Sequence, residues 1–399
     1  MRKKMNMRSV YGFYEFFAGG GMARIGLGAQ WSCLYANEWC QRKAASYKRN
    51  FDGGKELHVA DIASVTVDDL PGRADFAWAS FPCQDLSLAG KRAGLAGERS
   101  GTFHPFWRLV RDLTDENRRP SIIGLENVTG AITSNGGRDF HALLEVISEC
   151  GYRVGPLVID AVHFVPQSRP RLFVVAVEKS ISLEGLADNM SSLSPWQKYN
   201  LHDAWLRAPQ KVKDAWVWWR LPVPNIRTVS LADLIEDAPT SVPWHTAAET
   251  EKLIGMMSER NRMKLDAAIS SEGRHVGTIY KRTRVENGRK CQRAEVRFDG
   301  IGGCLRTPAG GSSRQIVIVI DQGKVRSRLL STREAARLMG LPDSYLLPES
   351  YNEAYHLAGD GVVVPVIQWL EQWLLQPLAA RASSGYSDPA YCSLKPALA

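Results

Sequence analysis

Four residues have the types and the order needed for covalent chemistry on an electron-poor ring. Cys83 lies in the run Ser-Phe-Pro-Cys-Gln, Glu126 in Glu-Asn-Val, and Arg169 and Arg171 in Gln-Ser-Arg-Pro-Arg. A thiolate is a nucleophile, a carboxyl group exchanges protons, and guanidiniums bind a carbonyl or an anion through charge-assisted hydrogen bonds. Singly, each has an ordinary structural explanation, as a buried thiol, a loop acid or a surface ion-pair partner. The ordered set favours a reactive cysteine.

Cytosine is a substrate that such a set could attack. Its C5 is too electron-poor to take a methyl group directly, but addition of the Cys83 thiolate at C6 makes C5 nucleophilic. Glu126 could donate a hydrogen bond or a proton to N3 as this happens. In a stacked duplex the ring is inaccessible, so the base would have to be rotated out.

The elements that must position these residues follow an α/β pattern from Val10 to about Val177. Short apolar runs alternate with amphipathic stretches, which is typical of βαβ units around a parallel sheet. The predicted strands are Tyr11–Phe17, Cys33–Asn37, Phe76–Ala79, Ile122–Glu126, Gly155–Asp160 and Arg171–Ala176, and the predicted helices include Phe103–Thr114 and Phe140–Cys150. Cys83 and Glu126 then lie at the carboxyl ends of strands, where open α/β sheets place their sites.

A glycine-rich turn precedes this constellation. The run Phe17-Ala-Gly-Gly-Gly21 follows the first predicted strand and precedes a helical pattern at Met22–Leu27, the context of a nucleotide-cofactor loop. Glu38 is placed to bind ribose hydroxyls, Trp39 to stack on an adenine, and Asp61 to address the adenine edge. Alone, the glycines make only a tight turn. The loop lacks the Lys-Ser/Thr ending of a nucleoside-triphosphate site. On these residues alone, a dinucleotide remains a possible cofactor.

Composition bounds the class of protein. The chain has 399 residues, 44% of them hydrophobic and 23% charged, with a formal net charge of +8, which fits a globular protein with a polyanionic partner or simply a basic enzyme. Its seven cysteines form no Cys-x-x-Cys pair, so neither a disulfide framework nor a metal site is predicted. Neither a signal peptide nor a membrane-spanning segment is predicted from the sequence. We expect a cytoplasmic, nucleoid-associated protein without membrane contact.

The second half of the chain differs in composition and has weaker periodicity. From about Ser180, tryptophans are interleaved with prolines, and a basic tract follows around Lys281, Arg282 and Arg284. We expect a catalytic domain at residues 10–180, completed by 306–378, a smaller irregular domain at 182–305, and a loosely ordered tail at 379–399. The tryptophans are expected to form the core of the small domain.

The chain resembles the bacterial DNA cytosine-5 methyltransferases. The resemblance rests on motifs that occur in the family's order over almost the whole chain: Phe17-Ala-Gly-Gly-Gly21, Asn37-Glu-Trp39, Asp61-Ile62, Phe81-Pro-Cys-Gln84, Glu126-Asn-Val128, Gln167-Ser-Arg-Pro-Arg171, Arg306-Thr-Pro308 and Gly359-Asp-Gly-Val-Val-Val-Pro365. Three positions depart from the family's pattern, namely Ser80 for Gly, Met22 for Gly, and Asp360 for Asn. Only Asp360 changes the charge near the expected cofactor.

The resemblance implies a Rossmann-like S-adenosylmethionine-dependent methyltransferase with a target-recognition domain. Cys83 would be the nucleophile, Glu126 would act at N3, and Arg169 with Arg171 would hold the base. The cofactor S-adenosylmethionine would contact Phe17, Gly19, Gly21, Glu38, Trp39, Asp61, Ile62, Phe103, Asp360 and Val362. DNA contacts are expected from Lys91, Arg92, Arg99, Gln167, Lys281, Arg282, Arg284 and Arg306, the first three on a glycine-rich loop suited to closing over DNA.

The implied function is methyl transfer to C5 of a flipped-out cytosine in a specific double-stranded DNA sequence. We expect a monomer from a restriction-modification system, whose cognate endonuclease acts at the same site without a stable complex. Two alternatives stay open: a catalytically silent DNA-binding protein of the same fold, and an RNA cytosine-5 methyltransferase.

Overall fold

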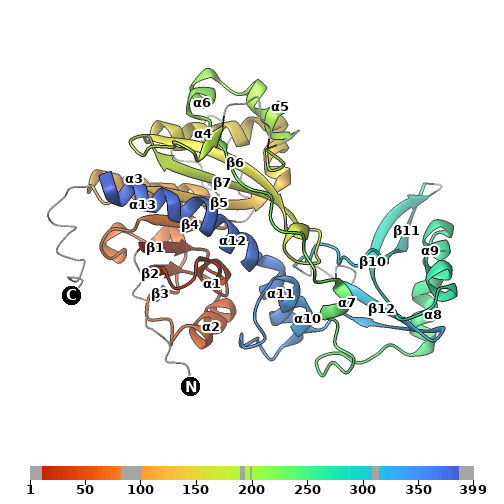
Figure 1. Cartoon of the computed structure of the whole chain (residues 1–399). Helices are drawn as coiled ribbons and strands as arrows, with labels where there is room; N and C mark the ends of the chain where they lie inside the picture. Colours follow the sequence, from red (N-terminus) through yellow and green to blue (C-terminus); the bar gives the residue numbers. More distant parts are fainter. Residues whose placement is uncertain are drawn as a thin grey trace.

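The computed structural model describes residues 11–81, 101–188, 194–197, 200–286, 288–307 and 314–385. It shows a large α/β part and a smaller part joined by long connections (Figure 1). The strands are β1 (Tyr11–Phe16), β2 (Trp31–Asn37), β3 (Leu57–His58), β4 (Phe76–Ala79), β5 (Ile122–Val128), β6 (Tyr152–Asp160), β7 (Pro170–Glu178), β8 (Ala187–Asp188), β9 (Trp218–Trp219), β10 (His275–Glu286), β11 (Arg289–Arg297), β12 (Ile316–Asp321) and β13 (Lys324–Leu329).

The helices complete the two parts. They are α1 (Met22–Leu27), α2 (Gln41–Asn50), α3 (Phe103–Asp115), α4 (Arg138–Glu149), α5 (Asn200–Arg207), α6 (Gln210–Ala215), α7 (Leu231–Leu234), α8 (Ala247–Gly255), α9 (Glu259–Ser270), α10 (Thr332–Leu338), α11 (Tyr351–Asp360), α12 (Val364–Leu370) and α13 (Gln376–Gly385). A π-helical stretch, η6 (Glu371–Leu375), joins α12 to α13, and short 3₁₀ turns lie between several elements.

The large part is built on a seven-stranded sheet of order β3-β2-β1-β4-β5-β7-β6. β1 to β5 are parallel to one another, as the sequence predicts, but β7 runs antiparallel to both β5 and β6. The predicted parallel sheet is therefore found for β1 to β5 but not at β7. The connection between β6 and β7 covers only residues 161–169, which is too short for the crossover that parallel strands need.

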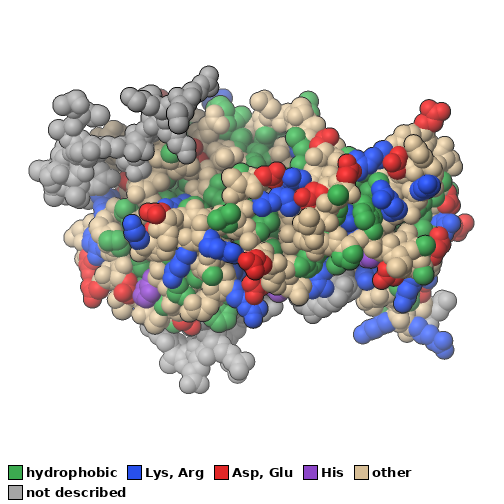
Figure 2. Space-filling model, turned by 90° about the horizontal axis from the view of Figure 1, so that it is seen from below, with side chains coloured by type: hydrophobic (Ala, Val, Ile, Leu, Met, Phe, Trp, Pro, Cys, Tyr) green, Lys and Arg blue, Asp and Glu red, His purple; other side chains and the backbone are tan. Residues whose placement is uncertain are grey.

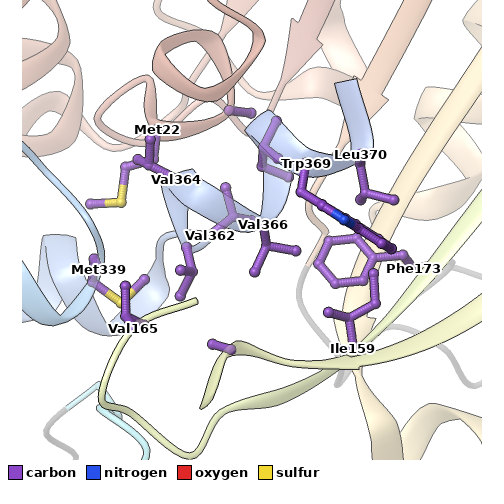
Figure 3. Packing of buried hydrophobic residues seen from close by; sticks show 14 of the residues in the cluster. Met22, Ile159, Val165, Phe173, Met339, Val362, Val364, Val366, Trp369 and Leu370 are labelled. Atoms are coloured by element: carbon purple, nitrogen blue, oxygen red, sulfur yellow. The ribbon is translucent and has the colours of Figure 1, made fainter. Parts of the chain in front are cut away.

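Alternating side chains give this sheet two buried faces. Phe13 packs on the face covered by α1 and α12, whereas its neighbour Tyr14 packs on the face covered by α3 and α4. On the first face, Val366 and Trp369 of α12 approach Phe173 of β7 (Figure 3). Helix α12 thus packs on this face of the sheet and helps to close the core.

Helical structure continues beyond the expected start of the tail. Ala379 is fully buried within α13, which ends at Gly385. Residues 379–385 are therefore helical rather than loosely ordered, because Leu378 and Ala379 join the core. Residues 386–399 lie outside the described residues. None of the described helices combines the length and the apolar character needed to cross a bilayer.

The smaller part contains an antiparallel sheet of order β11-β10-β12-β13, with α8 and α9 beside it (Figure 1). Leu265 of α9 packs with Ile279, Val296 and Ile318 from three of the strands. The second, smaller domain is thus present, and it holds a regular sheet that its sequence did not reveal. Since β12 and β13 lie beyond residue 305, this sheet extends past the expected boundary, and the domain limits stay a prediction.

The tryptophans between residues 196 and 219 do not form the core of the small part. Trp196 and Trp219 are fully buried on one face of the large sheet, while Trp216 and Trp218 pack on the other. Trp219 anchors its segment by donating a hydrogen bond from Nε1 to the carbonyl of Gly155 in β6, 2.9 Å away. The expectation of a small-domain core is wrong here because this segment packs on the large sheet before the chain crosses over.

Candidate active site

The carboxyl ends of β1 and β2 carry the predicted cofactor loop. Phe17, Gly19 and Gly21 all have positive φ angles, which turn the backbone sharply from β1 into α1. The Glu38 carboxylate fixes this turn, because Oε2 accepts a hydrogen bond from the Gly19 N–H and Oε1 from the Cys40 N–H, each at 2.8 Å. The structure therefore brings the glycine loop and Glu38 into direct contact.

The surroundings of this loop fit an adenosine-type ligand. Trp39 is 73% exposed, an unusual environment for an indole, and it follows the buried carboxylate of Glu38. A side chain at Gly19 would meet no atom within 4 Å, so open space lies above the loop. An exposed aromatic face, a carboxylate and open space beside a glycine turn are features that suit a nucleoside.

Three further predicted cofactor residues have different environments. Asp61 is exposed and accepts a hydrogen bond from the Ala63 N–H at 2.9 Å, which starts a 3₁₀ turn. Ile62 is buried, and Phe103 is completely buried, stacked on Trp107 with 5.8 Å between ring centroids. The structure thus leaves Phe103 beneath the surface, supporting the site from inside the core rather than lining it.

The C-terminal part of the chain lies beside the cofactor loop, as expected. The Tyr345 hydroxyl donates to the carbonyl of Gly20 at 2.8 Å. Gly361 lies against Met22, where a side chain would clash with the Met22 sulfur. Asp360 and the buried Val362 flank this contact, which places both next to the loop.

Glu126 is the centre of the predicted catalytic set. It is buried near the end of β5, where Oε2 accepts a hydrogen bond from Ser80 Oγ at 3.0 Å and Oε1 pairs with Arg171 Nε at 3.1 Å. Its neighbour Asn127 donates from Nδ2 to the carbonyl of Phe81 at 3.1 Å. This contact ties the chain two residues before Cys83 to the segment that carries Glu126.

Four predicted residues cannot be placed. Cys83, Lys91, Arg92 and Arg99 lie outside the described residues. The described part of the catalytic set is therefore Glu126 with Arg171 and, unforeseen from the sequence, Ser80.

Arg169 does not stand with Arg171 as a base-holding residue. It is 2% exposed, and its guanidinium donates to the backbone carbonyls of Leu305, Gly359 and Gly361 at 2.6, 2.8 and 2.9 Å. Burial, followed by the nearby Arg171 charge, lowers the pKa of Arg169 to about 10. The expectation that both arginines present themselves to the base is corrected for Arg169, which braces three segments of the chain.

The two arginines do converge on one side chain, the thiol of Cys304. Arg169 Nη1 lies 3.6 Å from Cys304 Sγ, and both terminal nitrogens of Arg171 lie 3.9 Å from it. No sequence motif singled out Cys304. The sequence feature nearest to Cys304 is the Arg306-Thr-Pro308 motif, which begins two residues later.

Gln167 is likewise a structural residue rather than a surface contact. It is fully buried, donates from Nε2 to the Leu338 carbonyl at 2.7 Å and accepts from the Leu305 N–H at 3.0 Å. The expectation of a direct DNA contact is therefore wrong in this structure, because the Gln167 amide joins the connection before β7 to α10 and to the segment before Arg306.

A cleft of about 610 Å³ opens between the large and small parts. It is lined by Ser168, Pro170, Arg260, Asn261, Lys264, Thr278, Tyr280, Arg282, Arg284, Glu295, Val296, Arg297, Gly303, Cys304, Arg306 and Gln315. Three predicted DNA-binding residues, Arg282, Arg284 and Arg306, share this wall. Lys281 is half-buried and lies on the same strand outside the lining.

Aromatic and acidic partners hold the cleft arginines in place. The guanidiniums of Arg282 and Arg306 lie 5.3 and 5.7 Å from the centre of the Tyr280 ring, and Arg282 and Arg284 both pair with Glu295. On the face shown in Figure 2, basic and acidic side chains are interspersed. The convergence of cations in the cleft, rather than a uniformly positive surface, therefore marks it as a candidate nucleic-acid interface.

Comparison with known proteins gives a consistent match. A family model for C-5 cytosine-specific DNA methylases covers residues 11–374. Type II methyltransferase M.HpaII of Haemophilus parainfluenzae is 27% identical over 395 residues, covering 94% of this chain and 91% of that protein. M.HhaI of Haemophilus parahaemolyticus is 24% identical over 362 residues, covering 90% and 92%. The solved structure of the Entamoeba histolytica methyltransferase EhMeth shares the fold, with a TM-score of 0.60 at 14% identity over 92% of this chain and 98% of that one.

Proposed function

This chain belongs to the C-5 cytosine-specific DNA methylase family, and we propose that it methylates cytosine through a covalent adduct of Cys83. The observation that carries the proposal is the fixed position of Glu126. Ser80 and Arg171 hold its two oxygens, and Asn127 beside it holds the carbonyl of Phe81. A nucleophile two residues further on would thus start from a backbone anchored next to the acid.

The proposed reaction has an addition step at C6 and an elimination step that regenerates the enzyme. The Cys83 thiolate adds to C6, while N3 receives a proton with the help of Glu126, and the C5–C6 electron pair becomes available at C5. Arg171 orients Glu126 and offers its remaining N–H groups to the base carbonyl. After C5 is methylated, C5 loses its proton to solvent, the C5–C6 double bond re-forms, the Cys83 thiolate leaves, and N3 returns its proton to Glu126.

S-adenosylmethionine is the proposed methyl donor. The glycine loop, Glu38, Trp39 and Asp61 would hold its adenosine, while Asp360 and Val362 would close the site from the C-terminal side. When bound, this cofactor supplies an electrophilic methyl group on a sulfonium. The buried Ile62 and Phe103 would keep the wall of the site rigid.

Double-stranded DNA is the proposed substrate, held in the cleft between the two parts. Arg306, Arg282 and Arg284 would contact phosphates or bases, and the target cytosine would rotate out of the duplex toward Glu126. Because the relatives are named type II methyltransferases, we propose that this monomer is the modification half of a restriction system. A cognate endonuclease would share its DNA site without forming a stable complex.

Labelling of DNA tests this function directly. With S-adenosylmethionine carrying a labelled methyl group and duplex DNA of varied sequence, we expect label in 5-methylcytosine. The Cys83→Ala variant should bind DNA but incorporate no label, and 5-fluorocytosine DNA should trap the wild-type protein covalently. Label at adenine, label in RNA but not DNA, or full activity of Cys83→Ala would overturn the proposal.

A further inference from the structure

An ion pair joins two helices, α2 and α11, that carry residues of the proposed cofactor site on or beside them. Lys43 Nζ, in the first turn of α2, lies 2.6 Å from Asp360 Oδ2 at the end of α11. The Thr307 hydroxyl donates to the other oxygen of Asp360. Burial lowers the pKa of Lys43, but the Asp360 carboxylate more than offsets this and leaves the pKa raised. The Asp360 carboxylate therefore holds Lys43 in its ammonium form.

The pair lies where the cofactor loop meets the C-terminal helices. Lys43 lies four residues after Trp39, and Asp360 precedes Gly361, which packs on Met22 just after the glycine loop. The Glu38 carboxylate does not depend on Lys43, since backbone N–H groups of the loop and of Cys40 already occupy it. Lys43 feels the Glu38 charge, which helps to raise its pKa, but its direct ion-pair partner among the described residues is Asp360.

The exposure of the pair distinguishes it from a purely structural bridge. The side chains of Lys43 and Asp360 are 25% and 32% exposed, so each charge can take another partner. An ammonium donates up to three hydrogen bonds, and a carboxylate accepts about four. A fully buried pair such as Arg328 with Glu334, by contrast, is closed to any ligand.

We propose that Lys43 and Asp360 form the subsite for the amino-acid end of S-adenosylmethionine, with Lys43 meeting its carboxylate and Asp360 its ammonium. This inference rests on the proposed function. The amino-acid end carries one charge of each sign, and a fixed pair of opposite charges complements it. A lone Asp360 would repel the ligand carboxylate, whereas the adjacent Lys43 offsets that repulsion.

Two ligands that differ only in this end provide the test. S-adenosylhomocysteine carries the amino-acid group, and 5′-methylthioadenosine is the same kind of thioether nucleoside without it. By calorimetry, Lys43→Met and Asp360→Asn should each weaken S-adenosylhomocysteine binding by about tenfold or more, as for loss of a charged hydrogen bond. Binding of 5′-methylthioadenosine should change by less than about twofold.

Two matched variants control for charge and for the tie between the helices. Glu353→Gln removes a second α2–α11 ion pair, Arg42 with Glu353 at 3.4 Å, and should leave both affinities unchanged. Lys48→Met removes an exposed charge from α2 and should do the same. The folded state of each variant is checked by its thermal unfolding.

Three binding results would contradict the inference or the proposed function. If Lys43→Met or Asp360→Asn weakens both ligands equally, the pair supports the site without touching the amino-acid end, and the inference fails. It also fails if the variants still prefer S-adenosylhomocysteine as wild type does. If wild type binds neither ligand, the proposed cofactor itself is wrong, which is a separate failure.

Discussion

At the scale of single residues, Arg169 and Arg171 are close in sequence but differ in their surroundings. Arg169 donates to three backbone carbonyls inside the protein, whereas Arg171 pairs with Glu126. We expect Arg169→Met to lower the free energy of unfolding by about 3 kcal/mol, because buried carbonyls lose their donors. Arg171→Lys should instead lower turnover with little loss of stability. Urea unfolding and methylation rates measure the two effects, and equal stability losses would contradict the assignment.

Glu15 gives the molecule a pH dependence that can be measured. It is fully buried on β1, and among the described residues its Oε2 has no hydrogen-bond partner. Burial raises the pKa of Glu15 from 4.5 to about 8; the nearby Arg24 charge lowers it, while Glu56 and Glu38 raise it. Between pH 4.5 and about pH 8, Glu15 therefore keeps its proton in the folded protein, whereas the same side chain in the unfolded chain has already lost it.

The sign of this effect follows from proton binding. Between about pH 4.5 and pH 8 only the folded state keeps the Glu15 proton, so stability is full below this window and falls as pH rises through it. The steepest loss is about 1.4 kcal/mol per pH unit. Glu15→Gln should remove this part of the slope in urea unfolding between pH 5 and 8.5. A variant that follows the wild-type slope would show that Glu15 is ionised in the folded protein.

Sequence patterns predicted the positions of Glu126 and Glu38 in the fold better than the contacts of other candidate residues. Glu126 and Glu38 were predictable because each lies at the end of an apolar strand, and strand ends meet at one edge of a sheet. The burial of Arg169 and Gln167 could not be predicted in this way, because their hydrogen-bond partners lie more than a hundred residues away in the sequence. Long-range contacts of this kind leave no local pattern.

At the scale of elements, helices and strands with strong periodicity were predicted almost to the residue. The expected helix at Met22–Leu27 and strand at Phe76–Ala79 have the bounds of α1 and β4. The reversal of β7 could also have been found, since the connection at 161–169 is too short for a parallel crossover. The pairing of β12 with β10 could not have been predicted, because an apolar run of residues does not specify which sheet it joins.

The contact between α1 and α12 leads to a prediction about helix packing. A methyl group on Gly26 would lie 2.5 Å from Cβ of Ile367 and 3.0 Å from the Val364 carbonyl, so α12 would have to move. We expect Gly26→Ala to destabilise the protein by about 1–3 kcal/mol. Gly255→Ala, in α8 with open space around it, should be neutral or stabilising by up to about 1 kcal/mol. Similar effects of both substitutions on the unfolding midpoint would contradict close packing at Gly26.

At the scale of the whole molecule, the two parts are joined by contacts between distant segments. Gln167 lies in register with Gly302, and Arg169 reaches both Leu305 and Gly359. Charge and composition alone indicated a basic tract in the second domain, but not that its arginines line a cleft together with Ser168 and Pro170 near the start of β7. That arrangement depends on how the chain crosses twice between the parts.

The cleft leads to a prediction about how DNA binding depends on salt. If Arg306 and Arg282 neutralise phosphates, each releases about one counterion on binding. Substitution of either by Gln should weaken binding of any duplex and reduce the slope of log affinity against log salt by roughly one. Fluorescence anisotropy with a labelled duplex at several salt concentrations measures this slope.

A matched surface charge separates this effect from that of net charge. Lys211 on α6 does not line the cleft and pairs with Glu149 at 2.6 Å, so Lys211→Gln should leave the slope unchanged. If Lys211→Gln lowers the slope as much as Arg306→Gln does, DNA senses the overall charge of the protein and not the cleft. If Arg306→Gln keeps the wild-type slope of log affinity against log salt, Arg306 does not contact a DNA phosphate. The expected contrast between the two variants follows because counterion release requires a cation close to a phosphate, and a charge of the same sign farther away is screened within about 10 Å at 0.1 M salt.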